Sequence, residues 1–339
     1  MGYPQTRRYA QPFSVLKCFK MSATVAVDLS VQIGALRLAN PVLAASGTFG
    51  YGIEFAHLVD LNRLGGIVVK GLSLEPLEGA PAPRLVESAG GMINAVGLQN
   101  VGVHAFVRDK LPALRAYRTA IVTNVFGHTV NEYAEVIRVL NDAEGVAAYE
   151  LNISCPNTDA GGAYFGIDPA MTARVVAASC KVANRPVWAK LSPNVTDITA
   201  IARAAADAGA AALTVANTYP AMSVDFRTGR SRLGRVSGGL SGPAIKPITQ
   251  KLVYEAAQAV KIPIIGLGGI ETGEDALEYL TLGATAVQVG TAHFSSPKAS
   301  VDLLNDLEKL CISNKVFNIS NLRGTFVANG SSKNEPVVL

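Results

Sequence analysis

The residues best suited to chemistry follow a buried stretch in the middle of the chain, where residues 147 to 162 read "AAYELNISCPNTDAGG". The stretch changes within a few positions from interior residues to Asn152, Ser154, Cys155 and an amide at Asn157. A free thiol has a pKa of about 8.5, so a modest lowering would make Cys155 a base or nucleophile near neutral pH. The alternative is an inert packed thiol, which is our interpretation of the other mid-chain and late cysteines, Cys180 and Cys311. Pro156 and the glycines that follow Cys155 instead predict a loop with a catalytic thiol.

The same change from apolar to polar occurs at the end of each predicted strand. Short apolar runs cover residues 41–46, 66–71, 120–125, 148–153, 187–192, 212–217, 262–269 and 286–291. They end on Ser46, Lys70, Asn124, Asn152, Lys190, Asn217, the pair Gly268 and Gly269, and the pair Gly290 and Thr291. One polar strand end is usually a turn former. Eight together indicate a shared functional rim.

The elements that position these residues alternate between strand and helix. Asp168 and Pro169 predict the start of a helix that ends before Pro186, and Thr272 with Asp275 predicts a capping box for a helix that closes at Gly283. Near-continuously apolar strands, each followed by a helix, predict an α/β fold with a covered parallel sheet. Closing that sheet gives a TIM (β/α)8 barrel, whose active sites lie at the carboxyl ends of the strands. A doubly wound open sheet is the alternative, because periodicity does not establish closure.

Two insertions are predicted to complete the rim. Residues 72 to 100 are too many for an ordinary strand-to-helix loop, and we expect them to form small strands over the barrel mouth. The segment from residue 218 to 241 contains four arginines, Arg227, Arg230, Arg232 and Arg235. Such a run is usually a solvated surface, and the alternative is a docking or lid surface.

Composition bounds the class of protein. With 49% apolar and 17% charged residues in 339, the chain can bury a large core, and a net charge of +4 without a basic–aromatic run argues against nucleic-acid binding. The four cysteines form no metal-binding pattern, which indicates a reduced, cytoplasmic setting, and no apolar run is long enough to span a membrane. We expect a flexible extension at 1–27 that faintly resembles a transit peptide, a barrel domain at 28–310 and a tail at 311–339.

Glycine turns follow the last two strands. "GLGG" and "VGT" can direct backbone N–H groups at one anion, and "GLSG" at residues 239 to 242 could add a third turn. These turns predict a phosphorylated cofactor. Lys190, across the barrel mouth, could then stabilise negative charge on a reduced flavin ring.

Several motifs together carry a family resemblance. "NPVLAASGTFGYG", "GIVVKG", "GMINAVGLQN", "ELNISCPN", "VWAKLSPNVTDI", "GGLSGPAIKP", "IPIIGLGGI" and "AVQVGTA" resemble the class 1 dihydroorotate dehydrogenases over residues 28 to 310. "SGTFGYG" and "NAVGLQN" are most similar to the class 1B catalytic subunits. The two ends of the chain match no family motif.

The resemblance implies bound FMN, no metal, and oxidation of (S)-dihydroorotate to orotate in de novo pyrimidine (UMP) biosynthesis. Cys155 would remove the C5 proton while hydride passes from C6 to flavin N5. The implied substrate-binding residues are Lys70, Asn94, Ala95, Val96, Gly97, Leu98, Asn152, Asn157, Asn217 and Thr218. The implied FMN-binding residues are Ser46, Lys70, Gly71, Asn124, Asn152, Lys190, Ala216, Gly242, Gly268, Gly269, Gly290 and Thr291.

The resemblance also implies partners. A class 1B subunit forms a homodimer or a heterotetramer with a subunit that carries FAD and a [2Fe–2S] cluster and passes electrons to NAD. The alternatives are a fumarate-linked class 1A enzyme, a dihydropyrimidine dehydrogenase-like enzyme and a non-catalytic flavin electron-transfer module. Asn157 argues against the dihydropyrimidine alternative, and Cys155 argues against the electron-transfer module.

Overall fold

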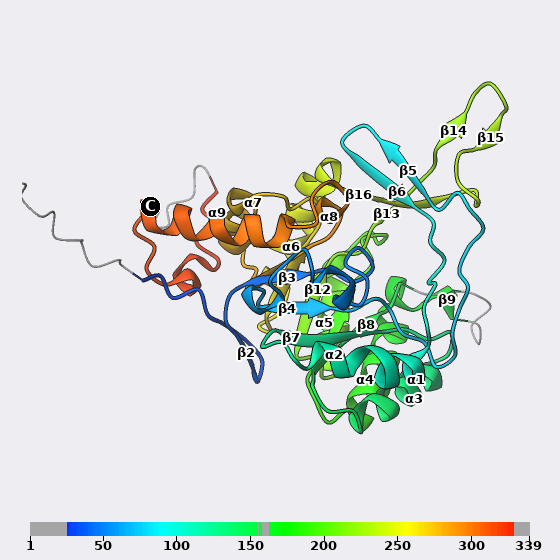
Figure 1. The fold of residues 1–339 in the computed structure, drawn as a ribbon, viewed down its shortest axis with the longest axis horizontal. Helices are drawn as coiled ribbons and strands as arrows, with labels where there is room; N and C mark the ends of the chain where they lie inside the picture. The colour runs from blue at the N-terminus through cyan, green and yellow to red at the C-terminus, as the bar shows by residue number, and fades with distance from the viewer. Residues whose placement is uncertain (1–25, 155, 158–162, 329–339) are drawn as a thin grey trace, which may run out of the picture.

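The structure, a computed structural model, describes residues 26–154, 156–157 and 163–328. Eight parallel strands close into a barrel that contains all of the predicted runs (Figure 1). In chain order they are β3 (Val42–Ala44), β4 (Gly66–Val68), β7 (Ala120–Val125), β8 (Val146–Asn152), β11 (Val187–Lys190), β12 (Ala212–Val215), β17 (Ile264–Leu267) and β18 (Ala286–Val289). The last strand pairs with the first, Val287 opposite Val42. The TIM barrel is therefore confirmed and the open sheet is excluded.

Helices cover the outside of the barrel. They are α1 (Val103–Ala105), the π-helix η3 (Phe106–Lys110), α2 (Leu111–Leu114), α3 (Val130–Asn141), α4 (Pro169–Val182), α5 (Ile198–Asp207), α6 (Lys246–Ala259), α7 (Gly273–Thr281), α8 (Ala292–Ser295) and α9 (Ala299–Ser313). Short 3₁₀ turns precede α4 and α6, at η5 (Phe165–Ile167) and η6 (Pro243–Ile245). Strand and helix thus alternate around most of the barrel.

The expectation of a helix after every strand is wrong for β3. The chain between β3 and β4 forms only the 3₁₀ turns η1 (Ile53–Phe55) and η2 (Leu61–Arg63). Gly47, Gly50 and Gly52 adopt positive φ angles there. A residue at positive φ cannot continue a right-handed helix, so the glycine-rich segment turns instead.

The predicted helix caps are present. The Asp168 carboxylate accepts a hydrogen bond from the Met171 backbone N–H at 2.7 Å, at the start of α4. Thr272 and Asp275 form a reciprocal capping box at the start of α7. Each cap satisfies backbone N–H groups that a helix leaves without partners at its first turn.

A four-stranded antiparallel sheet, the cover sheet, is built from the two insertions. It contains β5 (Leu85–Ser88), β6 (Gly91–Asn94), β16 (Gly238–Ser241) and β13 (Tyr219–Ala221). The small strands expected within 72 to 100 are thus confirmed. A hairpin of β14 (Val224–Asp225) and β15 (Arg230–Ser231) projects beyond it (Figure 1). All four arginines of this segment are exposed, as both a solvated surface and a docking or lid surface require, so the two alternatives stay predictions.

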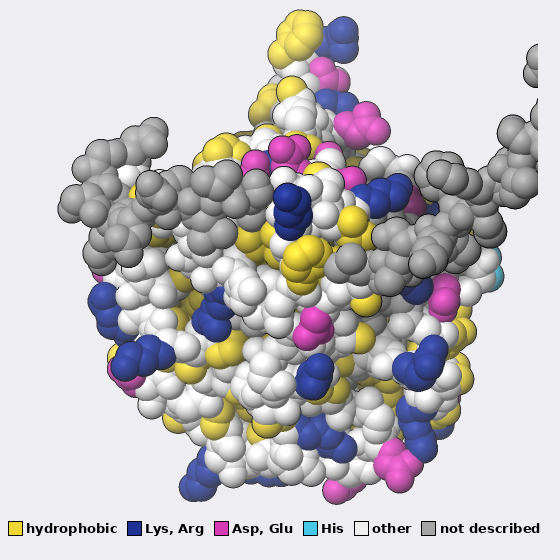
Figure 2. All heavy atoms as spheres, turned by 90° about the vertical axis from the view of Figure 1, so that its left-hand side faces the viewer, with side chains coloured by type: hydrophobic (Ala, Val, Ile, Leu, Met, Phe, Trp, Pro, Cys, Tyr) yellow, Lys and Arg dark blue, Asp and Glu magenta, His cyan; other side chains and the backbone are white. Residues whose placement is uncertain are grey.

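The remaining elements lie at the chain ends and near the barrel mouth. β1 (Val31–Ile33) pairs with β2 (Leu36–Leu38), and β9 (Pro156–Asn157) pairs with β10 (Ala163–Tyr164). The Asp28 backbone bonds to Phe317 and Ile319, which ties the start of the described chain to η7 (Ile319–Leu322). Lys and Arg are scattered over the face in Figure 2 rather than gathered in one patch. None of the described helices is long and apolar enough to cross a membrane.

Candidate functional site

A cavity of about 840 Å³, the mouth cavity, lies at the carboxyl ends of the barrel strands and extends to the cover sheet. Its lining includes every predicted binding residue whose side chain the structure describes. Those residues are Ser46, Lys70, Gly71, Asn94, Ala95, Val96, Gly97, Leu98, Asn124, Asn152, Lys190, Ala216, Asn217, Thr218, Gly242, Gly268, Gly269, Gly290 and Thr291. Cys155 lies outside the described residues, and so does the side chain of Asn157. The residues predicted from the sequence therefore meet in one cavity. The role of each residue remains a prediction.

Amide side chains on one side of the cavity are held by specific hydrogen bonds. Asn217 donates its Nδ2 to Asn152 Oδ1 at 3.1 Å, and its own Oδ1 accepts from the Thr218 backbone at 2.9 Å. Asn94 Nδ2 donates to the Gly239 carbonyl at 3.0 Å, which joins β6 to β16. Fixed amides present donors and acceptors in defined positions, as recognition of a planar ring edged with carbonyl and N–H groups requires.

Two lysines bring positive charge to the cavity. Burial and then the nearby Arg84 charge lower the pKa of Lys70. Burial also lowers the pKa of Lys190, which is 7% exposed, and the Glu150 carboxylate opposes that effect. Two partly desolvated cations in one cavity favour an anionic or electron-rich ligand.

Glu150 is a buried acid that the sequence reading did not single out. Its carboxylate, in the middle of β8 and 0% exposed, accepts from Asn124 Nδ2 at 2.8 Å, Thr214 Oγ1 at 2.7 Å and Gln288 Nε2 at 2.6 Å. The signal was a carboxylate inside an otherwise apolar strand. Gln288 lines the cavity, and its Oε1 is buried with no hydrogen-bond partner in the described structure. A buried acceptor without a partner, in a residue of the cavity lining, is a candidate partner for a ligand N–H group.

The glycine turns after β17 and β18 are shaped by their surroundings. A Cβ at Gly269, where φ is +67°, would meet Lys246 Cβ at 2.7 Å, so the packing itself requires glycine. A Cβ at Gly290 would meet Ala45 Cβ only at 3.7 Å, an ordinary contact. Packing therefore does not require glycine at Gly290, and its missing side chain leaves room in the cavity for a ligand. Thr291 Oγ1 donates to Ser241 Oγ at 2.8 Å and ties this turn to the cover sheet.

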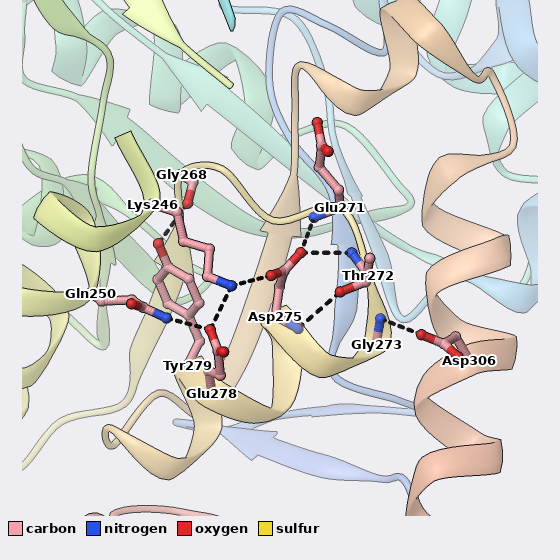
Figure 3. A network of polar contacts seen from close by, with 10 residues as sticks. All are labelled: Lys246, Gln250, Gly268, Glu271, Thr272, Gly273, Asp275, Glu278, Tyr279 and Asp306. Atoms are coloured by element: carbon pink, nitrogen blue, oxygen red, sulfur yellow. Dashed lines mark hydrogen bonds and ion pairs between the residues drawn. The ribbon is translucent and has the colours of Figure 1, made fainter. Parts of the chain in front are cut away.

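A polar network behind the first turn holds it in place (Figure 3). Tyr279 donates its hydroxyl to the Gly268 carbonyl at 2.6 Å. Lys246 pairs with Asp275, and Asp275 also accepts from the Thr272 backbone at 2.8 Å. Burial alone would lower the pKa of Lys246, but its bonds to Asp275 and Glu278 raise it. The network links α6 and α7 to the turn that lines the cavity.

The two described cysteines lie outside the mouth cavity. Cys180 in α4 is half-buried and contacts the Gly209 carbonyl at 3.3 Å, and Cys311 in α9 is 0% exposed. Burial raises the pKa of the Cys180 thiol, and burial followed by the Glu308 charge raises that of Cys311 to about 11. A raised pKa disfavours the reactive thiolate, in agreement with their interpretation as packed thiols.

A family model described as dihydroorotate dehydrogenase matches residues 28–311. The chain belongs to the dihydroorotate dehydrogenase family. It is thus an oxidoreductase. A Solibacter usitatus protein with the provisional name dihydroorotate dehydrogenase A (fumarate) is 57% identical over 298 residues, 88% of this chain and 98% of that protein. A dihydroorotate dehydrogenase B (NAD(+)) catalytic subunit from Trichlorobacter lovleyi is 51% identical over 296 residues, 87% and 97% of the two chains.

A solved structure is similar in fold to this dihydroorotate dehydrogenase family member. The Eimeria tenella enzyme in complex with ferulenol superimposes with a TM-score of 0.72 at 21% identity, covering 88% of each chain. At that identity the likeness supports the barrel fold alone.

Proposed function

We propose that this chain oxidises (S)-dihydroorotate to orotate in de novo pyrimidine biosynthesis, with FMN bound in the mouth cavity. The observation that carries the proposal is the meeting, in one cavity, of two residue sets of different chemistry. One set is the amide group around Asn152 and Asn217, and the other is the glycine turns with Lys190. The first set suits a planar amide-like substrate and the second suits a flavin phosphate and ring.

The residues present fit FMN. The turns at Gly268–Gly269 and Gly290–Thr291 would hold its phosphate, because backbone N–H groups at strand ends bind anions. The space at Gly290 and the free Gln288 Oε1 are consistent with a bound ring system that contacts the cavity floor. When bound, FMN supplies a two-electron hydride acceptor, and the Lys190 ammonium favours the negative charge that this acceptor gains.

The chain's own groups would orient the substrate and move its proton. Asn94, Asn152 and Asn217, with Asn157, would pair with the carbonyl and N–H edges of the ring. Lys70 would contact both ring systems. Cys155 would take the proton from C5, and a thiol suits that role near neutral pH. The C6 hydrogen leaves with its electron pair, so one proton and one hydride together account for the oxidation.

The similar proteins are named for different electron acceptors, fumarate or NAD(+). We propose a class 1B catalytic subunit, cytoplasmic and assembled as a homodimer or with a partner subunit that carries FAD and [2Fe–2S] and passes electrons to NAD. Relatives named as the B (NAD(+)) catalytic subunit, at 48 to 51% identity, support this assignment. The Solibacter usitatus relative, named for fumarate, favours the second candidate, a class 1A enzyme.

Anaerobic mixing with dihydroorotate tests the reaction. The FMN-loaded protein should lose its flavin absorbance near 450 nm on mixing, and Cys155→Ala should slow that loss by a factor of at least 100, because a positioned base typically contributes 10²–10⁴-fold. Cys180→Ala is the matched control and should bleach at the wild-type rate. A protein that holds FMN but does not bleach would exclude dihydroorotate as the substrate.

A further inference from the structure

The barrel floor below the mouth cavity carries a buried charge that the proposed reaction does not use directly. Glu150 and Lys190 lie on adjacent strands, β8 and β11, with Lys190 opposite Asn152 in the register. Both are buried, and the Glu150 charge acts on Lys190 in the direction that opposes burial. A cation this deeply buried keeps its proton only if a negative charge compensates the lost hydration.

The donors around Glu150 fit its ionised form. Its two carboxylate oxygens accept three hydrogen bonds, from Asn124, Thr214 and Gln288, and all three partners are neutral. Lys70, which also lines the cavity, has its pKa lowered by burial and by the charge of Arg84, so no acid of the described chain offsets its burial in the way that Glu150 offsets that of Lys190. Glu150 is thus an acid on the strand next to that of Lys190, and its charge opposes the effect of burial on the Lys190 pKa.

The same carboxylate fixes the orientation of Gln288. A carboxylate only accepts, so the Gln288 nitrogen must face Glu150 and its Oε1 must point elsewhere. That Oε1 is buried and has no hydrogen-bond partner among the described residues, and Gln288 belongs to the cavity lining. The Glu150 carboxylate thus acts on two residues of the cavity lining. It favours the charged form of Lys190, and it fixes the orientation of the Gln288 carboxamide.

We propose that Glu150 is a positioning residue that keeps Lys190 charged at the cavity floor and fixes the Gln288 carboxamide toward the bound flavin. The inference rests on the proposed function for its flavin part only. Removal of the Glu150 charge leaves the Lys190 ammonium uncompensated, so the lysine gives up its proton. Glu150 itself touches neither flavin nor substrate in this arrangement.

The first experiment needs no cofactor. Lysine labelled with ¹³C at Cε reports the titration of Lys190 by NMR in the apoprotein, with Lys190→Met to assign its signal. We expect Lys190 to be charged at pH 7 in the wild type and its titration to move down by at least one pH unit in Glu150→Gln. Glu150→Asp, which retains the charge, should preserve the wild-type state. Thr123→Val is the matched control, since Thr123 is fully buried in β7 and its hydroxyl has no partner among the described residues.

The second experiment uses the FMN-loaded protein. The slope of its reduction potential against pH gives the protons taken up per two electrons. We expect one proton in the wild type, where Lys190 is already charged, and two in Glu150→Gln, where the neutral lysine is protonated on reduction. A merely structural role of Glu150 would not change this number.

Two results would overturn the inference: a neutral Lys190 in the wild-type apoprotein at pH 7, or an unchanged Lys190 titration in Glu150→Gln. The wild-type measurement decides even where Glu150→Gln does not fold. A chain that fails to bind FMN contradicts the proposed function instead, and the NMR titration still tests the role of Glu150.

Discussion

At the scale of single residues, His293 beside the second glycine turn makes stability depend on pH. It is 3% exposed and lies between the Gly290 carbonyl at 3.1 Å and the Ser300 hydroxyl at 2.8 Å. Burial lowers the pKa of His293 from 6.5 to about 4, although the hydrogen bond with the Gly290 carbonyl acts in the opposite direction. Below pH 6.5 the unfolded chain therefore binds a proton at His293 that the folded chain does not bind. The free energy of unfolding falls as pH decreases from 6.5 to 4.

We expect His293 to account for a loss of up to about 3 kcal/mol in the free energy of unfolding over that range, since one pKa unit corresponds to about 1.4 kcal/mol. Urea unfolding at pH 7 and pH 4.5 measures it. His293→Gln should reduce the difference between the two pH values, whereas the exposed His57→Gln should keep it. A wild-type difference that survives in His293→Gln would assign the effect to other groups.

At the scale of elements, α7 positions the first glycine turn through Tyr279. Tyr279→Phe removes the bond to the Gly268 carbonyl, which is worth about 1 kcal/mol, and we expect FMN to dissociate about fivefold more readily because the turn loses its support. The matched control is Tyr149→Phe, since the Tyr149 hydroxyl donates to Asn141 and not to a residue of the mouth cavity. Fluorescence titration with FMN measures both. Equal losses of FMN affinity in the two variants would indicate general destabilisation.

The elements also show what the sequence could and could not predict. Apolar runs with polar ends located all of the barrel strands and their rim, because burial and strand direction are local properties. The pairing of β6 with β16 was not predictable, since Leu240 and Ile93 are far apart in sequence. The Glu150 carboxylate inside an apolar strand is visible in the sequence, but its role is not. Its three hydrogen-bond partners lie on three other strands, and only the closed barrel brings them together.

At the scale of the whole molecule, the mouth cavity decides which electron acceptor can act alone. In the proposed function FMN and orotate occupy its 840 Å³, so a dinucleotide must be bound elsewhere, whereas fumarate is small enough to enter after orotate leaves. After reduction by dihydroorotate, we expect the purified chain to be reoxidised by NAD⁺ only when the electron-transfer subunit of a B-type relative is added. Stopped-flow absorbance at 450 nm follows both acceptors. Rapid reoxidation by fumarate alone, with orotate as a competitor for the same cavity, would instead place this chain with its Solibacter usitatus relative, and the partner subunit would then have no part in turnover.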